Sequence, residues 1–403
     1  MEAFSPAYQK TYLKESMAFM YSIALQMLFG DRRKYVAIVM GITFAALIMT
    51  QQPSIFIGLL SRTYSFINDV SLPDIWVMDP GVQFVEEHKP MRDTDLGRIR
   101  GIKGVDWAAP MYKNLLRAKL PDGKTKTIDL TGIDDATLIG APHRIIEAHL
   151  LDIRSSDAIF VDYEAAQTRL RIKNSDGTTR SLKIGDVLEI NDHKAIVAGY
   201  IKSTRNFVLQ PQVYTTYSRA LNYAPTNRKY LTYVLVKAKA GENLHEICQK
   251  IENDTGLSAY TAEEFRHVNL DYWMKNTGIP INFGISVLLG FIVGAAVAGQ
   301  TFFNFVQENL KHYAVLKSMG LENGTLILMV MLQAFVVGLI GYGMGIGLTA
   351  LFGLKVYDSV LAFKMAPFIL LFSATGVFVI VLLSALLGIW RVVRVDPSTV
   401  FRG

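Results

Sequence analysis

Four long apolar runs interrupt the polar pattern of this chain and set its architecture. They cover residues 35–60, 281–303, 325–354 and 366–390. Each run reaches the roughly 20 apolar residues that are needed to cross about 30 Å of hydrocarbon. The first run is too long for the apolar core of a cleavable signal peptide, so we expect it to remain a membrane span. The pattern predicts an α-helical membrane protein with four transmembrane helices.

Residues 61–280 change to short alternating units. The strand-like segments 105–120 and 127–133 flank Pro121-Asp122-Gly123, which is typical of a hairpin turn. Thr261 and Glu264 fit a capping box, and the helix that starts there would run to the second span. This block therefore predicts a large α+β extracytoplasmic domain, inserted between the first and second spans.

Basic residues near the ends of the runs indicate the orientation. Arg32, Arg33 and Lys34 precede the first run, and by the positive-inside rule they hold the N-terminus in the cytoplasm. Four crossings return the C-terminus to the same side. The other basic residues expected on this side are Lys311, Lys317, Arg391, Arg394 and Arg402. We expect both termini to be cytoplasmic and the large domain to face the outside, because the loop after the third span carries fewer basic residues.

The expected organisation has four parts. Residues 1–34 carry a lead-in helix over 12–30, which suits an amphipathic helix in the inner membrane interface or, alternatively, an irregular segment with one apolar patch. Residues 35–60 form the first span, and 61–280 form the α+β domain with its stalk helices. Residues 281–403 contain three spans, a cytoplasmic helix at 305–320 and a short basic tail.

Composition excludes several classes of function. Hydrophobic residues make up 51% of the chain, and part of the modest net charge of +6 lies at the inner membrane edge, so nucleic-acid binding is not indicated. Cys248 is the only cysteine, which rules out an intrachain disulfide and a cysteine-based metal site. Among His143, Glu147 and His149, the last falls off the shared helical face, so we expect no metal site. No G-x-x-x-x-G-K-[ST] phosphate loop occurs, so we expect a non-catalytic chain that does not itself bind ATP.

Small residues recur at a spacing of four in two spans. They are Gly290, Gly294 and Ala298 in the second span, and Gly341, Gly343, Gly345 and Gly347 in the third. Such a spacing forms a groove that lets two helix backbones approach closely. The pattern leaves two alternatives open, which are packing among the chain's own helices and a homodimer seam.

In the first span, Gln51 and Gln52 interrupt the apolar run. These amides either reach the outer headgroups or face a cavity, where they would form a polar gate. The span centres contain no Asp, Glu, Lys, Arg or His, which argues against a proton or ion relay.

The segment FVQENLKHYAVLKSMG, residues 305–320, separates two of the spans. Residues 305–319 have the length and the apolar periodicity of one amphipathic helix. Glu308 near its start and Lys317 near its end complement the helix dipole, and Gly320 is a natural stop. We interpret this segment as a built cytoplasmic element rather than a simple connector.

The run ENLKHYAVLKSMG resembles the coupling segment of the MacB/FtsX-type permeases of ABC transporters, and most closely that of the DevC-like branch. Residues 41–45 (GITFA) and 395–397 (VDP) are also similar to that branch. The layout of the whole chain matches that of the family. In that family this segment docks on the ATPase. The resemblance therefore implies that the residues at the motif positions contact the ATPase, and these are Glu308, Leu310, Tyr313, Leu316, Lys317, Met319 and Gly320.

The resemblance further implies a set of partners. It implies two permease chains in the lipid of a bacterial inner membrane, seated on two copies of a separate ABC ATPase that carries ATP and Mg. Closure of the ATPase would pass through stalk helices near 59–70 and 261–278 to a periplasmic domain, a process described as mechanotransmission. The DevC-like features favour an exporter with a periplasmic adaptor and an outer-membrane channel. The alternatives are a regulator of an extracytoplasmic hydrolase and a lipoprotein-extraction permease.

Overall fold

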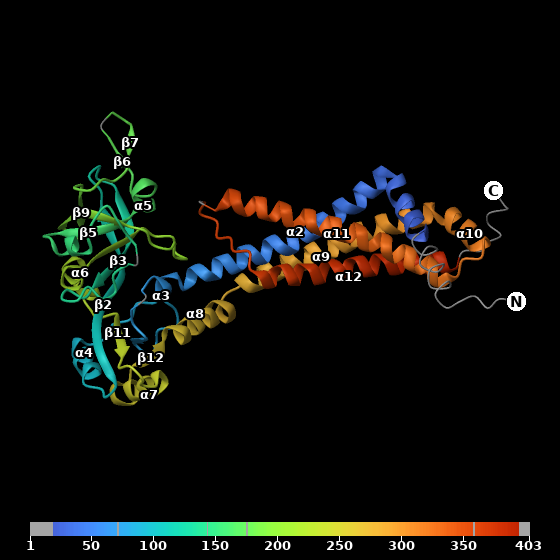
Figure 1. Cartoon of the computed structure of the whole chain (residues 1–403). Coiled ribbons are helices and arrows are strands. Elements are labelled where there is room, and N and C mark those ends of the chain that lie inside the picture. Colours follow the sequence, from blue (N-terminus) through green and yellow to red (C-terminus); the bar gives the residue numbers. More distant parts are fainter. Residues whose placement is uncertain (1–18, 71, 143, 175, 358, 395–403) are drawn as a thin grey trace. The chain divides into compact units, whose positions relative to one another are not determined.

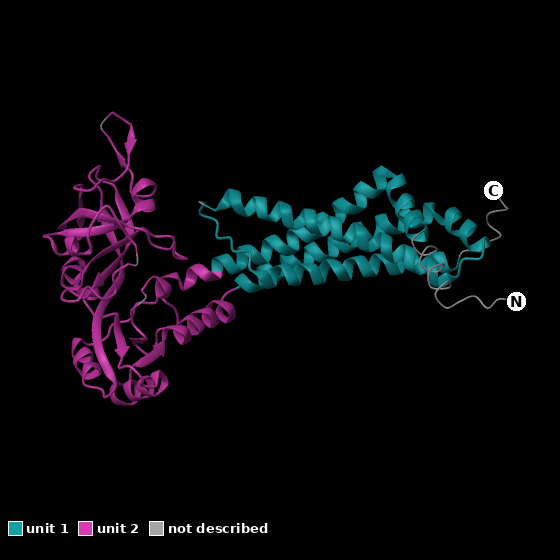
Figure 2. Ribbon diagram, viewed as in Figure 1, with its two compact units in different colours: residues 1–59, 278–403 teal, residues 60–277 magenta. Residues whose placement is uncertain are grey.

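The structure, a computed structural model, describes residues 19–394 except 71, 143, 175 and 358. It divides into two compact units, one formed by 1–59 and 278–403 and the other by 60–277 (Figure 2). The first half of the expected lead-in segment, His143, the basic tail from 395 onward and the 395–397 motif lie outside the described residues. The units are described separately below.

The first unit is a bundle of long helices (Figure 1). Its four apolar helices are α2 (Arg32–Thr63), α9 (Ile279–Glu308), α11 (Asn323–Val356) and α12 (Pro367–Val393). Each is long and apolar enough to cross a membrane, which confirms the four predicted spans. Helices α2, α9 and α11 extend beyond their apolar runs at both ends, because the helical hydrogen-bond ladder can continue past the hydrocarbon.

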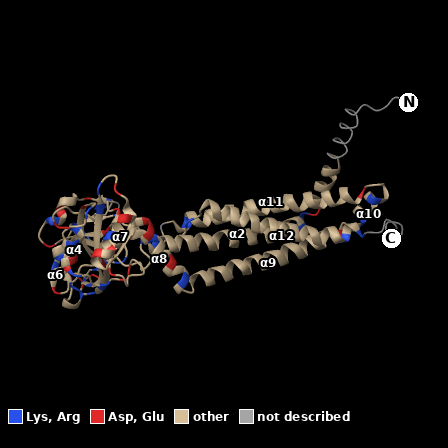
Figure 3. Ribbon diagram, turned by 90° about the horizontal axis from the view of Figure 1, so that it is seen from below, with Lys and Arg blue, Asp and Glu red and all other residues tan. Residues whose placement is uncertain are grey.

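A shorter helix, Phe19–Gly30, precedes α2, so the described half of the lead-in segment is helical as expected. Its residues Ala24 and Leu28 are fully buried in the same apolar core as Ile38 of α2 and Val330 of α11. Charged residues lie mainly towards the ends of the bundle, and its middle is almost free of them (Figure 3). This distribution is the one that a hydrocarbon layer requires.

Helix α2 fills the small-residue grooves of its neighbours. A methyl group added at Gly294 of α9 would lie 2.2 Å from Cβ of Ala45, and one added at Gly345 of α11 would lie 2.5 Å from Cβ of Ala46. Gly290 and Gly341 face α2 in the same way, at Ile48 and Ile42. Only glycine leaves room for so close an approach of two helices. A second chain could therefore use these four glycines only by displacing α2.

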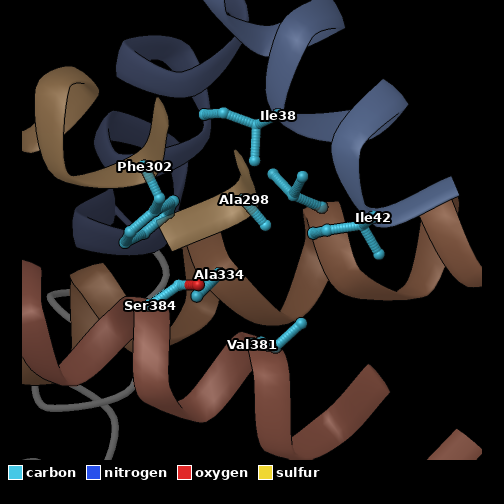
Figure 4. A pocket seen from close by; sticks show the side chains of 8 residues that line it. Ile38, Ile42, Ala298, Phe302, Ala334, Val381 and Ser384 are labelled. Atoms are coloured by element: carbon cyan, nitrogen blue, oxygen red, sulfur yellow. The ribbon is translucent and has the colours of Figure 1, made fainter. Parts of the chain in front are cut away.

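A cavity of about 10 Å³ lies where the four spans meet (Figure 4). Its lining residues are Ile38, Ile42, Ala298, Phe302, Ala334, Val337, Val381 and Ser384. The hydroxyl of Ser384 donates to the carbonyl of Ile380 in its own helix at 2.8 Å, so the cavity offers little to a polar guest. Its volume allows about one water molecule at most.

The second unit contains a ten-stranded sheet in the order β12-β1-β11-β2-β3-β10-β5-β9-β4, with β8 paired to β2 and β9. The strands are β1 (Ile75–Met78), β2 (Val105–Lys119), β3 (Thr125–Ile133), β4 (Ile145–Ile146), β5 (Ala158–Asp162), β8 (Val187–Ile190), β9 (His193–Ile201), β10 (Gln212–Thr216), β11 (Tyr233–Ala238) and β12 (Ser258–Thr261). A separate small hairpin joins β6 (Ile172–Lys173) to β7 (Thr179–Arg180). Strand β2 is long because its first half pairs with β11 and its second half with β3.

Six helices and two 3₁₀ turns complete the described part of the second unit. They are α3 (Ser65–Asp69), α4 (Asp93–Arg100), α5 (Tyr163–Gln167), α6 (Tyr217–Tyr223), α7 (Leu244–Thr255), α8 (Ala262–Asn276), and the 3₁₀ turns Leu150–Arg154 and Thr226–Arg228. The predicted α+β domain between the first and second spans is thus confirmed.

Two local predictions in this unit are also confirmed. The turn between β2 and β3 places Gly123 at φ +81°, a left-handed conformation that glycine adopts without strain. At the start of α8, the Thr261 hydroxyl accepts from the Glu264 amide at 3.2 Å, and the Glu264 carboxylate accepts from the Thr261 amide at 2.8 Å. This reciprocal pair is the predicted capping box.

Candidate functional site: the segment between the second and third spans

The segment 305–320 is not one helix, and the prediction of a single helix over 305–319 is wrong. Its first residues complete α9, which ends at Glu308, and a separate helix α10 spans Leu310–Ser318. The interruption is at Asn309, whose side-chain Nδ2 donates to the Phe305 carbonyl at 2.8 Å. Asn side chains compete in this way with the backbone ladder. Helix α10 is therefore a distinct element at one end of the bundle (Figure 1).

The inner side of α10 is held by a chain of hydrogen bonds. Tyr313 is fully buried, and its hydroxyl donates to Oε1 of Gln333 in α11 at 2.8 Å. Gln333 is also fully buried, and its Nε2 donates to the Ala24 carbonyl at 2.8 Å. Buried polar groups that are satisfied in this way specify one arrangement. Three elements, α10, α11 and the helix Phe19–Gly30, are thereby joined through two side chains.

Charged groups hold both ends of the segment. The Glu308 carboxylate forms an ion pair with Lys34 of α2, and Lys34 also pairs with Asp31 at 2.7 Å. The Lys317 ammonium donates to the carbonyl of Val393, the last residue of α12, at 3.0 Å. An open depression lies beside the first pair, and its lining residues are Gln26, Met27, Gly30, Asp31, Lys34, Glu308, Asn309 and His312. Both charged residues thus bind other helices of the chain. Lys317 lies in the last turn of α10 and complements its dipole, whereas Glu308 ends α9 and does not lie in the first turn of α10, so its predicted dipole role is wrong.

The outer side of α10 carries exposed apolar residues. Met319 is 73% exposed and Val315 is 40% exposed, and Lys311, His312 and Ser318 are exposed beside them. Gly320 has φ +96°. Its amide donates to the Lys317 carbonyl at 3.1 Å, and the Leu321 amide donates to the Leu316 carbonyl at 3.2 Å. These two bonds form a Schellman motif, which ends α10 at the predicted glycine.

The residues that the motif assigned to an ATPase contact therefore divide into two groups. Tyr313 lies inside the chain, and Leu310 and Leu316 pack partly against the same apolar core. Met319 and Gly320 are exposed. Glu308 is exposed while it binds α2, and Lys317 is partly exposed while it binds α12. The outer face available to a partner is formed by Lys311, His312, Val315, Ser318 and Met319.

Sequence reasoning missed two residues of this arrangement. Val315 lies four residues before Met319 and therefore on the same face of the helix, so helical spacing from Met319 would have identified it. Gln333 is a lone amide in the apolar run 325–354, and a lone polar residue in a span is a sign of a buried partner. Gln51 and Gln52 are half-buried in α2 directly before Pro53, which lies within the helix. Their role as a polar gate stays a prediction.

Comparisons with known proteins agree with this layout. The family model "MacB-like periplasmic core domain" matches residues 36–254, which is more than half of the chain, and the model "FtsX-like permease C-terminal" matches residues 284–397. An uncharacterized ABC transporter permease of Mycobacterium tuberculosis is 23% identical over 318 residues, which cover 78% of this chain and 80% of that protein.

Other relatives match over shorter stretches. An uncharacterized ABC transporter permease of Methanocaldococcus jannaschii is 23% identical over 167 residues, covering 40% of this chain and 41% of its own length. An uncharacterized ABC transporter permease of Mycobacterium bovis is 30% identical over 119 residues, which cover 30% of this chain and 33% of that protein. The match to these two relatives thus spans less than half of their length.

Two solved structures are similar to the second unit. The periplasmic region of MacB from Actinobacillus actinomycetemcomitans has a TM-score of 0.37 and 13% identity, covering 52% of this chain and 96% of that one. The extracellular domain of the noncanonic ABC-type transporter YknZ from Gram-positive bacteria has a TM-score of 0.33 and 11% identity. The match covers 47% of this chain and 98% of that domain. The assignment to a family rests on the two family models, whose matches together cover most of both units. The chain belongs to the MacB/FtsX-type family of ABC transporter permeases.

Proposed function

We propose that this chain is the membrane subunit of an ABC-type exporter, and that it transmits the ATP-driven motion of a separate ATPase to its MacB-like domain, residues 60–277. The observation that carries the proposal is the two-sided nature of α10. Its outer face exposes Val315 and Met319, its inner face and its end are joined to α11, α12 and the helix Phe19–Gly30, and Glu308 directly before it is paired with Lys34 of α2. A force applied to the outer face would therefore reach every one of these helices.

The close packing at the point where the four spans meet supports transmission rather than passage there. The cavity at the meeting point of the spans has room for about one water molecule. A ligand shifts a conformational equilibrium only by binding one state better than the other. In this proposal the ATPase, with its own ATP and Mg, supplies that difference by gripping α10 in one nucleotide state.

The assembly that fits this role has two permease chains and two ATPase subunits in a bacterial inner membrane. The MacB-like domain would lie in the periplasm, where an adaptor and an outer-membrane channel would receive the exported molecule. Membrane lipid would contact the apolar outer surface of the bundle, and both termini would lie in the cytoplasm.

The test adds a charge to the outer face of α10. We expect Val315→Asp with Met319→Asp to lower the affinity for the cognate ATPase at least about tenfold, because apolar anchors at the centre of an interface carry most of its binding energy. The measurement is ATPase binding and permease-stimulated ATP hydrolysis in the reconstituted complex.

The matched control is Ile184→Asp, which adds the same charge at an apolar residue of similar exposure, 44% against 40% for Val315, in the MacB-like domain. Ile184→Asp should bind and stimulate the ATPase as the native chain does. Unchanged binding and stimulation in the double variant would contradict the proposal.

A further inference from the structure

The MacB-like domain is entered and left through two helical segments. The chain enters at the last residues of α2, around Thr63, and leaves through α8, which ends at Asn276. These two segments are the covalent connections through which the spans can pass a displacement on to the domain. The contacts between them inside the domain therefore decide whether they move together.

Asn269 of α8 joins these two segments to a third one. The residue is fully buried, and its side-chain Nδ2 donates to the Thr63 hydroxyl at 2.8 Å. Its Oδ1 accepts from the backbone amide of Val85, in the segment 79–91, at 3.1 Å. Thr63 is itself buried, and its hydroxyl donates to the Leu60 carbonyl at 2.7 Å, so it can only accept from Asn269. Both ends of the Asn269 amide are thus fixed by partners that allow one orientation only.

The segment 79–91 leads on to the sheet. The Tyr233 hydroxyl of β11 donates to the Val85 carbonyl at 2.8 Å, and the Met91 amide donates to the Leu231 carbonyl at 2.9 Å. Val85 therefore has its amide bound to α8 and its carbonyl bound to β11. A continuous hydrogen-bonded path runs from α8 through one residue into the central sheet.

The other buried contacts of α8 in this region are apolar, and one further hydrogen bond, from Nη1 of Arg266 to Oδ1 of Asn68 at 3.0 Å, lies at the exposed surface. The centroid of the Phe265 ring lies 5.9 Å from that of Trp76 and 6.1 Å from that of Tyr233. The Tyr272 ring stacks on Phe84 with their centroids 4.5 Å apart. Apolar packing is non-directional and tolerates sliding, whereas a hydrogen bond weakens steeply when its angle changes. The two bonds of Asn269 are therefore the buried hydrogen bonds that fix the register of α8 against Thr63 and Val85.

We propose that Asn269 is a positioning residue that locks α8 to the end of α2 and to segment 79–91, so that a displacement of either helix is delivered to β11. This inference rests on the proposed function, because it assigns the route by which the ATPase-driven motion enters the domain. Asn269 touches no transported molecule in this role. It acts by holding three backbone segments in one arrangement.

The experiment compares hydrogen exchange of the full chain in its complex with the ATPase, with and without a non-hydrolysable nucleotide. In the native complex we expect nucleotide to change exchange in α8 and in segment 79–91, each by about tenfold at its most responsive amides. In Asn269→Leu, which keeps the branched shape but removes both hydrogen bonds, the change should persist in α8 and disappear from segment 79–91.

Two further variants separate this role from plain destabilisation. Asn269→Asp keeps an acceptor for the Val85 amide and should restore most of the nucleotide response in segment 79–91. Glu263→Gln changes an exposed carboxylate on the same helix and should behave as the native chain does. Asn269→Leu should also leave ATPase binding unchanged, since α10 is not altered.

The outcomes that overturn the proposals are distinct. An Asn269→Leu complex that keeps the native nucleotide response in segment 79–91 overturns the role of Asn269 alone. A native complex in which nucleotide changes exchange neither in α8 nor in segment 79–91 overturns the proposed function, and the inference that rests on it.

Discussion

Two titratable side chains of segment 79–91, Glu86 and His88, are enclosed next to the ion pair of Lys113 and Asp129. Lys113 and Asp129 are each about 2% exposed, with Nζ 2.6 Å from Oδ2. Burial raises the pKa of Glu86 from 4.5 to about 7, although the charge of Lys113 acts in the opposite direction. Burial and the charge of Lys113 lower the pKa of His88 from 6.5 to about 3. Both residues are therefore held towards their neutral forms.

The two shifts have opposite effects on stability. Protonated Glu86 adds to the free energy of unfolding, because the folded state holds its proton more tightly than the unfolded state. This stabilisation is fully present below pH 4.5 and is lost as the pH rises through about 7. The contribution of His88 is present above pH 6.5 and is lost as the pH falls towards about 3. The two effects partly cancel between pH 4.5 and 6.5, and only Glu86 still titrates above that range.

We therefore expect Glu86→Gln to stabilise the MacB-like domain at pH 8 but not at pH 4. The gain in the free energy of unfolding has an upper limit of about 3 kcal/mol, which corresponds to a shift of about 2.5 pKa units. Trp fluorescence during thermal unfolding is a suitable measurement, because Trp76, Trp107 and Trp273 lie in this domain. Glu263→Gln, at an exposed carboxylate, is the control. A difference from the native chain that stays constant between pH 4 and pH 8 would contradict the assignment.

At the scale of elements, the long helices were predictable and α10 was not. A span is recognised from length and composition alone, and a capping box or a C-terminal glycine is a local signal, so α8 and the end of α10 could be read from the sequence. The break at Asn309 has no glycine or proline to mark it, and apolar periodicity continues across it. The burial of Tyr313 depends on Gln333 and Ala24, which are distant in the sequence. A substitution Tyr313→Asp would therefore test folding rather than docking.

The Schellman motif of α10 gives a prediction with a close control. At Gly320 and at Gly324 an added methyl group would meet no atom within 4 Å, but only Gly320 has a positive φ, at +96°. Gly320→Ala should cost about 1 to 2 kcal/mol through backbone strain, whereas Gly324→Ala, in the first turn of α11, should be neutral or stabilising. We expect Gly320→Ala alone to increase hydrogen exchange over residues 316–321. Equal exchange in the two variants would show that the motif does not hold the end of α10.

At the scale of the whole molecule, the order of the parts could be predicted from the sequence, but the pairing of the strands could not. The hydrophobic runs fix the four spans and the position of the inserted domain, because the bilayer imposes a minimum length on each span. Strand order depends on contacts between distant residues. Strand β10 pairs with β3 in parallel across about 80 residues of intervening chain, and β5 pairs with β9 in the same sense. Alternation within each strand shows which face is buried, but not which strand is its neighbour.

The distribution of basic residues along the bundle predicts its orientation. One end carries Arg32, Arg33 and Lys34 before α2 and Lys311 and Lys317 in α10, whereas the opposite end has Lys355 and Lys364. Basic residues in short loops favour the cytoplasmic side, so a reporter fused after Gly403 should be active in the cytoplasm, and one inserted at Gly177 in the turn between β6 and β7 should be active outside it.

Changing Arg32, Arg33 and Lys34 together to Glu should lower the fraction of chains that give this pattern, because the first span loses its flanking charges. Changing Lys355 and Lys364 to Glu should preserve or raise that fraction. A reporter after Gly403 that is active only outside the cytoplasm would place α10 on the wrong side for an ATPase and would remove the basis of the proposed function.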